Sequence, residues 1–347
     1  MTAWRNPAVM AALAAAVLFG AGAPAAKLLL GSTSPWLLAG LLYLGSGFGL
    51  ALARQFRRTE SVRLARGEIK WLAIAVATGG VVGPVLLMLG LSRMPASAAS
   101  LLLNAEAVFT ALLAWFVFHE NFDRRIALGM ALIVIGALVL SWPGEFGFVS
   151  ALPALAVLGA CFAWAIDNNL TRKIALTDAT FIAMVKGIAA GLVNVAIAWI
   201  LGATFPSFQV VIAACVVGFF SFGASLVLFV VALRHLGAAR TGAYFSIAPF
   251  AGAMIAFVLL GEAVTVTLVV AGLLMAAGVW LHLTEHHEHA HAHGVMEHAH
   301  EHLHDEHHQH EHDSPVPHNT RHTHRHSHDP LTHSHSHYPD AHHGHQH

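Results

Sequence analysis

Long stretches of chain without a charged residue constrain the fold more than any other feature. Asp, Glu, Lys and Arg are absent from residues 6–26, 28–53, 126–144 and 187–233. About 20 apolar residues in a helix cross the hydrocarbon core of a bilayer, and each run approaches or exceeds that length. Charged residues make up 11% of the chain, against roughly 25% in globular proteins. The sequence therefore excludes a soluble single-core domain and predicts an integral membrane protein.

Gly, Pro and charged residues divide the apolar sequence into ten predicted membrane-spanning helices. They cover residues 7–30, 36–53, 71–91, 97–118, 126–141, 151–171, 180–201, 210–233, 241–260 and 264–283. The first of these segments resembles a signal peptide, because Arg5 precedes an apolar stretch. That stretch continues past Ala21 and Ala23 to Leu30, so we expect a transmembrane helix instead. The predicted fold class is all-α integral membrane.

Basic residues concentrate in alternate connections, which predicts the orientation in the membrane. These connections carry Arg54, Arg57, Arg58, Arg63, Arg66 and Lys70, then Arg124 and Arg125, then Arg172 and Lys173, then Arg234 and Arg240. The opposite side shows only Arg93. We therefore expect both termini in the cytoplasm and a multi-pass protein of a bacterial-type inner membrane. The one dense basic segment is short and lies between apolar runs, so we expect no nucleic-acid partner.

An internal repeat relates the two halves of the membrane region. At an offset of 142, residues 91–96 (LSRMPA) align with 233–238 (LRHLGA), and the helix ending at Glu120 aligns with the helix ending at Glu262. Five spans in each half make the halves enter the membrane in opposite directions, as in inverted-repeat transporters, whose substrate site lies near the midplane. We predict repeats over 1–145 and 146–283, followed by a tail over 284–347.

The tail has a composition of its own. All but two of the 28 histidines, His119 and His235, lie between residues 282 and 347. This composition cannot build a packed core, so we expect a cytoplasmic tail that is disordered when empty. Alternating histidines with nearby carboxylates suit Ni, Co or Zn, and no cofactor is expected to be obligatory. The predicted metal ligands are His286, His287, His289, His291, His293, His298, His300, His302, His304, His307, His308, His310, His312, His322, His324, His326, His328, His333, His335 and His337.

Polar residues inside the predicted spans are candidates for the transport pathway, because ionisable groups in a membrane are costly. Glu106 lies mid-span with Asn104 two positions earlier, and its carboxyl can carry a proton or meet a cation. The structural alternative is a protonated carboxyl bonded to a neighbouring helix. Lys186 and Asn194 share one helical stripe. Lys186 can line the pathway, snorkel to the interface, or pair with Glu106 or Asp167.

Other polar residues have a second, structural interpretation. Asp167 and Asn168 form either a polar gate or the end of a helix. Gly187 and Gly191 form a GxxxG motif that we expect to serve helix packing. Glu120 and Glu262 are expected to hold turns or pair with loop cations, and Lys27 to snorkel to the interface. Prolines such as Pro84 interrupt helices and free carbonyls, which often marks a transporter site, although a kink is the commoner meaning.

These residues resemble a known family. Two five-helix halves with helices ending at Glu120 and Glu262, together with residues 167–172 (DNNLTR), are similar to the EamA branch of the drug/metabolite transporter superfamily. The second half keeps the helix proline of that family, Pro249, whereas the first half has Glu106 at the position that matches Ala248. Within the family, a long His-rich tail resembles the cobalt–nickel resistance exporters. The resemblance implies a secondary transporter and not an enzyme.

The function expected from sequence is export of a small solute, with Ni²⁺ or Co²⁺ as the leading candidate. Expelling a divalent ion against 100 mV costs about 4.6 kcal/mol. No P-loop occurs in the sequence, so we expect exchange for protons carried by Glu106. One alternative is an amino-acid or metabolite exporter whose tail only buffers metal or regulates. Another is a membrane-anchored metal buffer or sensor that transports nothing. A homodimer is one assembly that we expect for such a transporter.

Overall fold

The computed structural model describes most of the membrane region and four segments of the tail. The described residues are 6–57, 66–118, 124–141, 151–171, 178–236, 238–283, 288–293, 296–302, 322–328 and 331–336. They fall into two compact units, which divide between Thr284 and Glu285.

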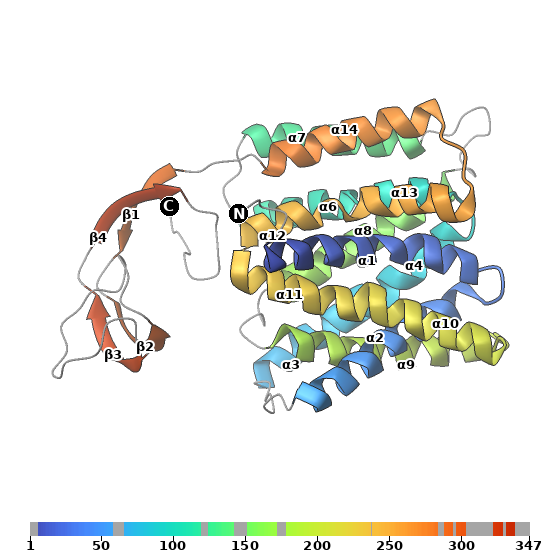
Figure 1. Ribbon diagram of the computed structural model, residues 1–347, viewed down its shortest axis with the longest axis horizontal. Helices are drawn as coiled ribbons and strands as arrows, with labels where there is room; N and C mark the ends of the chain where they lie inside the picture. The colour runs from blue at the N-terminus through green and yellow to red at the C-terminus, as the bar shows by residue number, and fades with distance from the viewer. Residues whose placement is uncertain are drawn as a thin grey trace. The chain divides into compact units, whose positions relative to one another are not determined.

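The first unit consists of helices (Figure 1). The first repeat contains α1 (Pro7–Leu29), α2 (Pro35–Arg57), α3 (Arg66–Ala75), the π-helical segment η2 (Val76–Val82), α4 (Gly83–Leu91), α5 (Ala96–Leu102), α6 (Ala105–Phe118) and α7 (Arg124–Ser141). The second contains α8 (Leu152–Thr171), α9 (Ala179–Ile200), α10 (Phe208–Gly218), the π-helical segment η5 (Phe219–Ala224), α11 (Ser225–Leu236), α12 (Ala238–Phe245), α13 (Ala248–Leu260) and α14 (Val266–Leu283).

Among the described residues, nine helical stretches are long and apolar enough to cross a membrane, and a shorter apolar helix over Val266–Leu281 follows them. The predicted all-α membrane fold is therefore confirmed. Several stretches join two or three of the helices above: α3, η2 and α4 form one, α5 and α6 a second, α10, η5 and α11 a third, and α12 and α13 a fourth. We call the end of the bundle where α1 begins and α14 ends the basic end.

Helices of different halves pack against each other throughout the bundle. The pairs with extensive contact include α2 with α9, α7 with α14, α1 with α13 and α4 with α8. In Figure 1, α7 and α14 lie side by side at one edge. A Cβ added at Gly187 would lie 2.7 Å from the Cα of Gly47, so only glycine lets α9 approach α2 this closely. The packing role expected for the GxxxG motif is confirmed here.

Helix irregularities occur at matching positions of the two repeats. The π-helical segments η2 and η5 both interrupt a long span. A turn at 103–104 separates α5 from α6, and a turn at 246–247 separates α12 from α13. Within one residue, each pair has the offset of 142 that relates the sequence repeats. The repeat therefore extends from sequence to backbone, including the breaks that transporters use at their sites.

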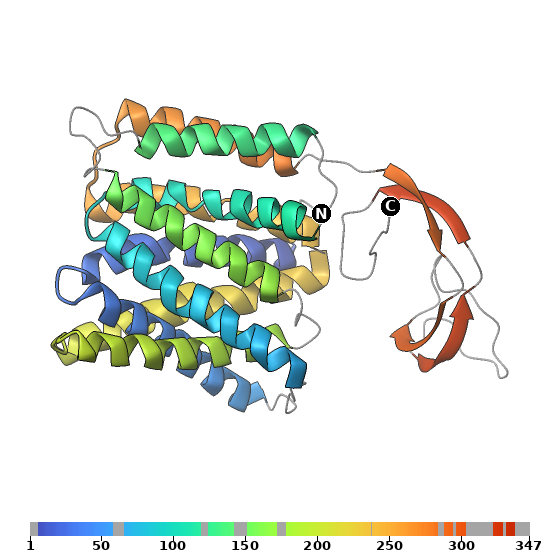
Figure 2. The same cartoon turned by 180° about the vertical axis from the view of Figure 1, so that it is seen from behind.

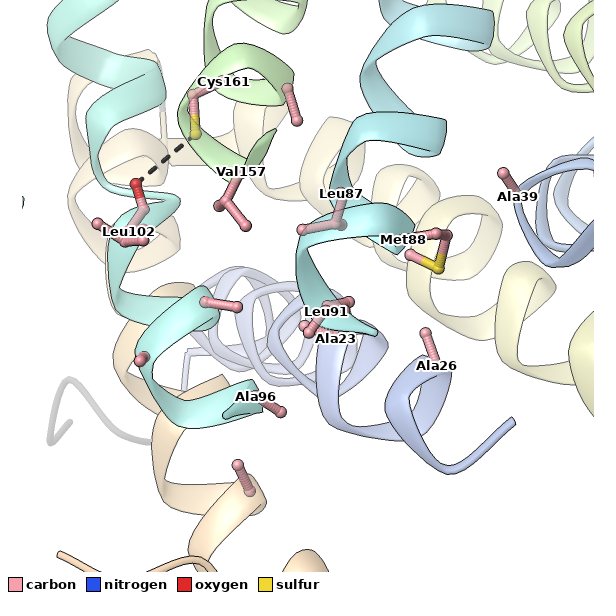
Figure 3. Close-up of a cluster of buried hydrophobic side chains, with 14 of the residues drawn as sticks. Ala23, Ala26, Ala39, Leu87, Met88, Leu91, Ala96, Leu102, Val157 and Cys161 are labelled. Carbon is pink, nitrogen blue, oxygen red and sulfur yellow. Dashed lines mark hydrogen bonds between the residues drawn. The ribbon is translucent and has the colours of Figure 1, made fainter. Parts of the chain in front are cut away.

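The core lies where α4, α5 and α8 meet α1 (Figure 3). Small side chains such as Ala23 and Ala96 let these helices approach, and Leu91 and Val157 fill the space between them. The Cys161 thiol lies 3.6 Å from the carbonyl oxygen of Leu102, where α5 ends. This contact supplies a weak partner to a carbonyl released by the break after α5.

The tail forms strands over part of its length. Strand β1 (Glu288–His293) pairs antiparallel with β4 (Leu331–Ser336), and β2 (Met296–His302) pairs antiparallel with β3 (His322–His328). The structure thus differs over these ranges from the disordered tail that we expected. Alternation of histidine with other residues has the period of two that a strand requires, and a two-stranded ladder pairs backbone groups without needing a core. The two sheets are separate.

Candidate transport site

An ion pair lies between the α8 and α9 segments of the second repeat. The Lys186 ammonium donates hydrogen bonds to both carboxylate oxygens of Asp167, one of them at 2.6 Å. The Lys186 side chain is only 16% exposed and the Asp167 side chain only 7%. Of the two acids that sequence offered to Lys186, Asp167 is therefore its partner. A charge pair removed from water in this way is costly to build and costly to break.

Glu106 lies close to this pair but has a neutral partner. The side-chain amide of Asn168 donates a hydrogen bond of 2.8 Å to the Glu106 carboxyl, and the same amide lies 3.5 Å from the Thr110 hydroxyl. Asn168 and Asp167 are consecutive residues of α8, so the same turn of this helix supplies the partner of Glu106 and the partner of Lys186. The structure thus brings together Glu106, Asp167, Asn168 and Lys186, as their selection from sequence proposed.

The backbone of η2 forms the other wall of this site. The carbonyl of Gly79 accepts hydrogen bonds from the Tyr43 hydroxyl at 2.9 Å and from the Trp164 indole at 2.8 Å. The carbonyl of Gly80 accepts one from the Asn194 amide at 3.1 Å. Pro84 follows four residues after Gly80 and has no N–H for that carbonyl. Asn194 therefore replaces a missing helical hydrogen bond.

Asn104 does not join this group. Its amide donates to the carbonyl of Leu101 at 2.8 Å and lies 3.9 Å from the sulfur of Met275. Asn104 is 5% exposed and occupies the turn between α5 and α6. These contacts assign it a role in the helix break, and they place it apart from the ionisable residues it was grouped with.

Sequence reasoning missed Tyr43, Trp164, Gly79 and Gly80. Aromatic residues within apolar spans usually belong to the core, and their role here depends on the carbonyls that η2 releases. The signals that could have found them are the Gly79–Gly80 pair just before Pro84 and the rarity of tyrosine, with three in the chain. Figure 2 shows this face of the bundle, with α8 in green beside the light-blue span that α3, η2 and α4 form.

Substitution of Gly79 by alanine should disable the site. A Cβ at Gly79 would overlap the Asp167 carboxylate, so the ion pair or η2 must move, at a cost of about 1–3 kcal/mol. We expect Gly79→Ala to lower the melting temperature in detergent and to abolish transport. Gly242→Ala is the matched control, because nothing lies within 4 Å of a Cβ there. Equal behaviour of the two variants would contradict the close fit of η2 against Asp167.

In the second repeat, the π-helical segment η5, which matches η2, carries aromatic rings. At the repeat offset, Ser221 and Phe222 match Gly79 and Gly80, and Ala248 matches Glu106. Phe222 lies against both Phe19 and Tyr43, with ring centroids 5.9 Å apart in each case. The charged and polar cluster therefore has no duplicate in the matching positions. Tyr43 contacts both π-helical segments: its ring packs on Phe222 of η5, and its hydroxyl donates to the Gly79 carbonyl of η2.

Two charged residues, Lys27 and Glu262, bind helix ends at the end of the bundle opposite the basic end. The Lys27 ammonium donates to the carbonyls of Leu91 and Met94, so it binds the end of α4 from the last turn of α1. The Glu262 carboxylate accepts from the backbone N–H groups of Ala96 and Ser97, at 2.6 and 2.9 Å. Each charge complements the dipole of the helix end that it touches. The structural role expected for Glu262 is confirmed, whereas Glu120 lies outside the described residues.

An ion pair at the basic end connects α2 with the start of α9. Asp178 caps α9 through the Thr180 N–H, at 2.9 Å, and pairs with Arg54. Burial alone would raise the pKa of the Asp178 carboxyl from 3.8, but hydrogen bonds from Thr180 and Arg54 outweigh this effect and lower the pKa to about 2. Arg54 also lies over the ring of Phe181.

A carboxyl with a depressed pKa in the folded state stabilises above its unfolded pKa and loses that contribution as pH falls through the folded value. The stability that Asp178 contributes should therefore be complete above about pH 4 and be lost between about pH 4 and pH 2. Asp178→Asn keeps a capping side chain and removes the charge, so it should cost about 1 kcal/mol at neutral pH. Melting temperatures in detergent from about pH 2 to pH 7 test this: the two proteins should converge at the acidic end, and a constant difference would contradict the ion pair.

The predicted metal ligands of the tail divide between described and other residues. His289, His291, His293, His298, His300, His302, His322, His324, His326, His328, His333 and His335 lie in β1–β4. His286, His287, His304, His307, His308, His310, His312 and His337 lie outside the described residues. In the part of the chain that the structure describes, no group of three His, Cys, Asp or Glu side chains could hold a metal ion.

Comparison with known proteins identifies the family. The sequence model of the EamA-like transporter family matches the chain twice, over residues 6–142 and 151–284. The chain belongs to this family. It is thus a multi-pass membrane transporter, as the resemblance in the sequence implied. The family's members are transporters, and no enzyme activity follows from the match.

The names of individual relatives also refer to transporters. An uncharacterised transporter of Methanothermobacter thermautotrophicus is 30% identical over 287 residues, which cover 78% of this chain and 84% of that protein. A probable terminal-alkyne amino-acid exporter of Streptantibioticus cattleyicolor is 27% identical, over 67% of this chain and 82% of that protein. A probable amino-acid metabolite efflux pump of Salmonella typhimurium is 43% identical, but over only 27% of its length.

A solved crystal structure of another protein has the same fold. It superposes with a TM-score of 0.59 at 19% sequence identity, and the match covers 80% of this chain and 98% of that one. The likeness supports the arrangement of the ten spans.

Proposed function

We propose that this EamA transporter exports a small organic zwitterion, such as an amino acid, in exchange for protons. The observation that carries the proposal is the buried pair of Lys186 and Asp167 beside η2. A positive and a negative group next to each other within the membrane complement the carboxylate and the ammonium of a zwitterion. Interrupted helices form the substrate sites of inverted-repeat transporters, and η2 is such an interruption.

Glu106 is the proposed proton carrier. The charges of Lys186 and Asp167 cancel, so the protonation of Glu106 sets the net charge of the group. A zwitterion leaves that charge unchanged, whereas each proton that enters moves one positive charge inward. An inside-negative potential adds about 2.3 kcal/mol per 100 mV to that step. Both the pH gradient and the membrane potential therefore drive export.

Two further observations support an organic solute. The relatives from Streptantibioticus and Salmonella carry names that refer to amino acids or their metabolites. The Phe19, Tyr43 and Phe222 rings lie near the polar group, where they suit the apolar part of such a solute. Inner-membrane location with cytoplasmic termini remains part of the proposal, because it determines the direction of transport.

The second candidate is export of Ni²⁺ or Co²⁺, and the His-rich tail is the observation that favours it. Imidazole and carboxylate groups bind these ions well. The membrane region is less suited, since Lys186 would repel a divalent cation and the described residues lack a group of three metal-binding side chains. We therefore rank the organic zwitterion first and treat the tail separately.

Inside-out membrane vesicles decide between the two candidates. Uptake of a labelled amino-acid mixture and of labelled Ni²⁺ and Co²⁺ is measured with the vesicle interior made acidic. Gradient-dependent amino-acid uptake that is lost in Lys186→Met is the expected result, with Lys70→Met, at the basic end, as the matched control. Uptake of the metal ions without any amino acid would overturn the first proposal in favour of the second.

A further inference from the structure

Two charged side chains, one from each repeat, bind the short connection between α4 and α5, residues 91–97. From the last turn of α1, the Lys27 ammonium donates to the carbonyls of Leu91 and Met94. From just beyond α13, the Glu262 carboxylate accepts the first two N–H groups of α5. The two charges also attract each other. The α4–α5 connection is therefore held from both sides by opposite charges.

These bonds supply partners that the connection lacks on its own. Pro95 occupies the position before α5 and offers no capping side chain. Glu262 also accepts the hydroxyl of Ser97. Hydrogen bonds in which one group is ionised are roughly twice as strong as neutral ones. Figure 3 shows the apolar side of the same closure, with Ala23 and Ala26 of α1 next to the end of α4. The end of the bundle opposite the basic end is thus closed.

The corresponding position of the other repeat lacks the charge. At the repeat offset, the neutral Asn169 matches Lys27. Its amide donates to the carbonyls of Thr110 and Ala165, at 3.2 and 2.9 Å. Likewise α1 packs on α5, whereas α8 and α12, the matching pair, have no comparable contact within the described helices. Glu120, the match of Glu262, lies outside the described residues. The two ends of the bundle therefore differ although the repeats match.

The transport site is open towards the basic end. Asn168, which donates to Glu106, lies in the last turn of α8 and is exposed. The exposed apolar residues Leu155 and Phe162 belong to another side of this helix, about 120–140° away at 3.6 residues per turn. The exposure of Asn168 is therefore access to the site and not contact with lipid. Because α8 ends at the basic end, this access comes from there.

We propose that the α4–α5 connection is the gate between the site and the side opposite the basic end, and that Lys27 and Glu262 are the residues that hold it shut. Opening requires both charges to leave their backbone partners, so the gate stays closed unless another state is favoured by more than these bonds contribute. The direction rests on the proposed function: with the basic end in the cytoplasm, the closed gate lets the exporter take up its solute from inside.

Labelling of a cysteine behind the gate tests this role. Ser100 of α5 is 1% exposed and faces Gly252 of α13, and its hydroxyl has no hydrogen-bond partner among the described residues. Ser100→Cys is therefore a mild reporter, placed in a protein whose native cysteines, Cys161 and Cys215, are replaced by alanine. A membrane-impermeant maleimide is applied to right-side-out and to inside-out vesicles without solute, and the labelling rate is divided by the total labelling after denaturation.

Lys27→Met and Glu262→Gln should each raise the labelling rate in right-side-out vesicles by about fivefold or more, the factor that a loss of about 1 kcal/mol produces. Arg93→Met is the matched control, because it removes an exposed positive charge from the same connection and should leave the rate unchanged. Melting temperatures in detergent show whether each variant is folded.

Unchanged labelling in both gate variants would overturn the gate and leave only a packing role for the two charges, whatever the melting temperatures. An equal rise in Arg93→Met would overturn it as well, because any lost charge would then suffice. A rise seen only in inside-out vesicles would support the gate and overturn the orientation in the proposed function. Labelling needs no transported solute, so failure of the gate and failure of the amino-acid proposal are separate results.

Discussion

Glu106→Gln should uncouple transport from the pH gradient. A gradient of one pH unit is worth about 1.36 kcal/mol per proton, which supports about tenfold accumulation for one-to-one exchange. An amide carries no titratable proton, so we expect accumulation in inside-out vesicles to fall to the level found without a gradient. The side-chain oxygen of the introduced amide still accepts the hydrogen bond that Asn168 now donates to the carboxyl, so the protein should fold and reach the membrane.

The measurement is the accumulation ratio of a labelled amino acid at several imposed gradients. Downhill exchange of labelled for unlabelled solute serves as the internal control, because it needs no net proton movement and should persist in Glu106→Gln. Glu68→Gln, the same substitution in the first turn of α3, is the matched control and should keep the slope of the unaltered protein. A Glu106→Gln protein that still accumulates about tenfold per pH unit would remove Glu106 from the coupling.

The helices of the membrane region could be predicted from sequence because their cause is local. Apolar length and charge punctuation decide whether a segment crosses a bilayer, and these properties are visible in runs such as 187–233. The predicted spans 180–201 and 210–233 leave a break that contains Gly202 and Pro206, and α9 and α10 lie on either side of it. The repeat was visible for the same reason, since aligned positions carry aligned turns.

The partners within the site could not be predicted, because they depend on contacts between helices. Nothing in the sequence says that Lys186 binds Asp167 and leaves Glu106 to an amide. The π-helical segments change which backbone groups are hydrogen-bonded, but they do not change the hydropathy of the sequence. The sequence therefore did not show that the Gly79 carbonyl in η2 accepts hydrogen bonds from Tyr43 and Trp164. The same holds for Lys27, which reaches the carbonyls at the end of α4 because α1 and α4 approach each other there.

The tail shows the reverse case, in which composition hid a pattern. Low hydrophobicity and high polarity argued against a core, and that argument stands. Alternation of histidine along residues 298–302 and 322–328 also has the period of a strand, and the register adds what alternation alone cannot give, namely which histidine faces which. The composition of the tail therefore does not determine which solute the membrane region transports.

Asp167→Asn should be the most damaging single change to the membrane region. It leaves the Lys186 ammonium buried without a counter-charge, which costs about 3–5 kcal/mol in comparable pairs. It also alters the carboxylate that accepts the Thr171 hydroxyl at 3.0 Å. We expect a lower yield in the membrane, a lower melting temperature in detergent and no transport.

The double variant Asp167→Asn with Lys186→Met separates stability from function. It removes both charges together, and replacing a buried pair by neutral groups is often neutral or stabilising. Melting temperature should therefore return towards that of the unaltered protein while amino-acid transport stays absent, because neither charge of the zwitterion then has a partner. Recovery of transport in the stable double variant would show that the pair only holds α8 to α9 and would contradict its role in binding the solute.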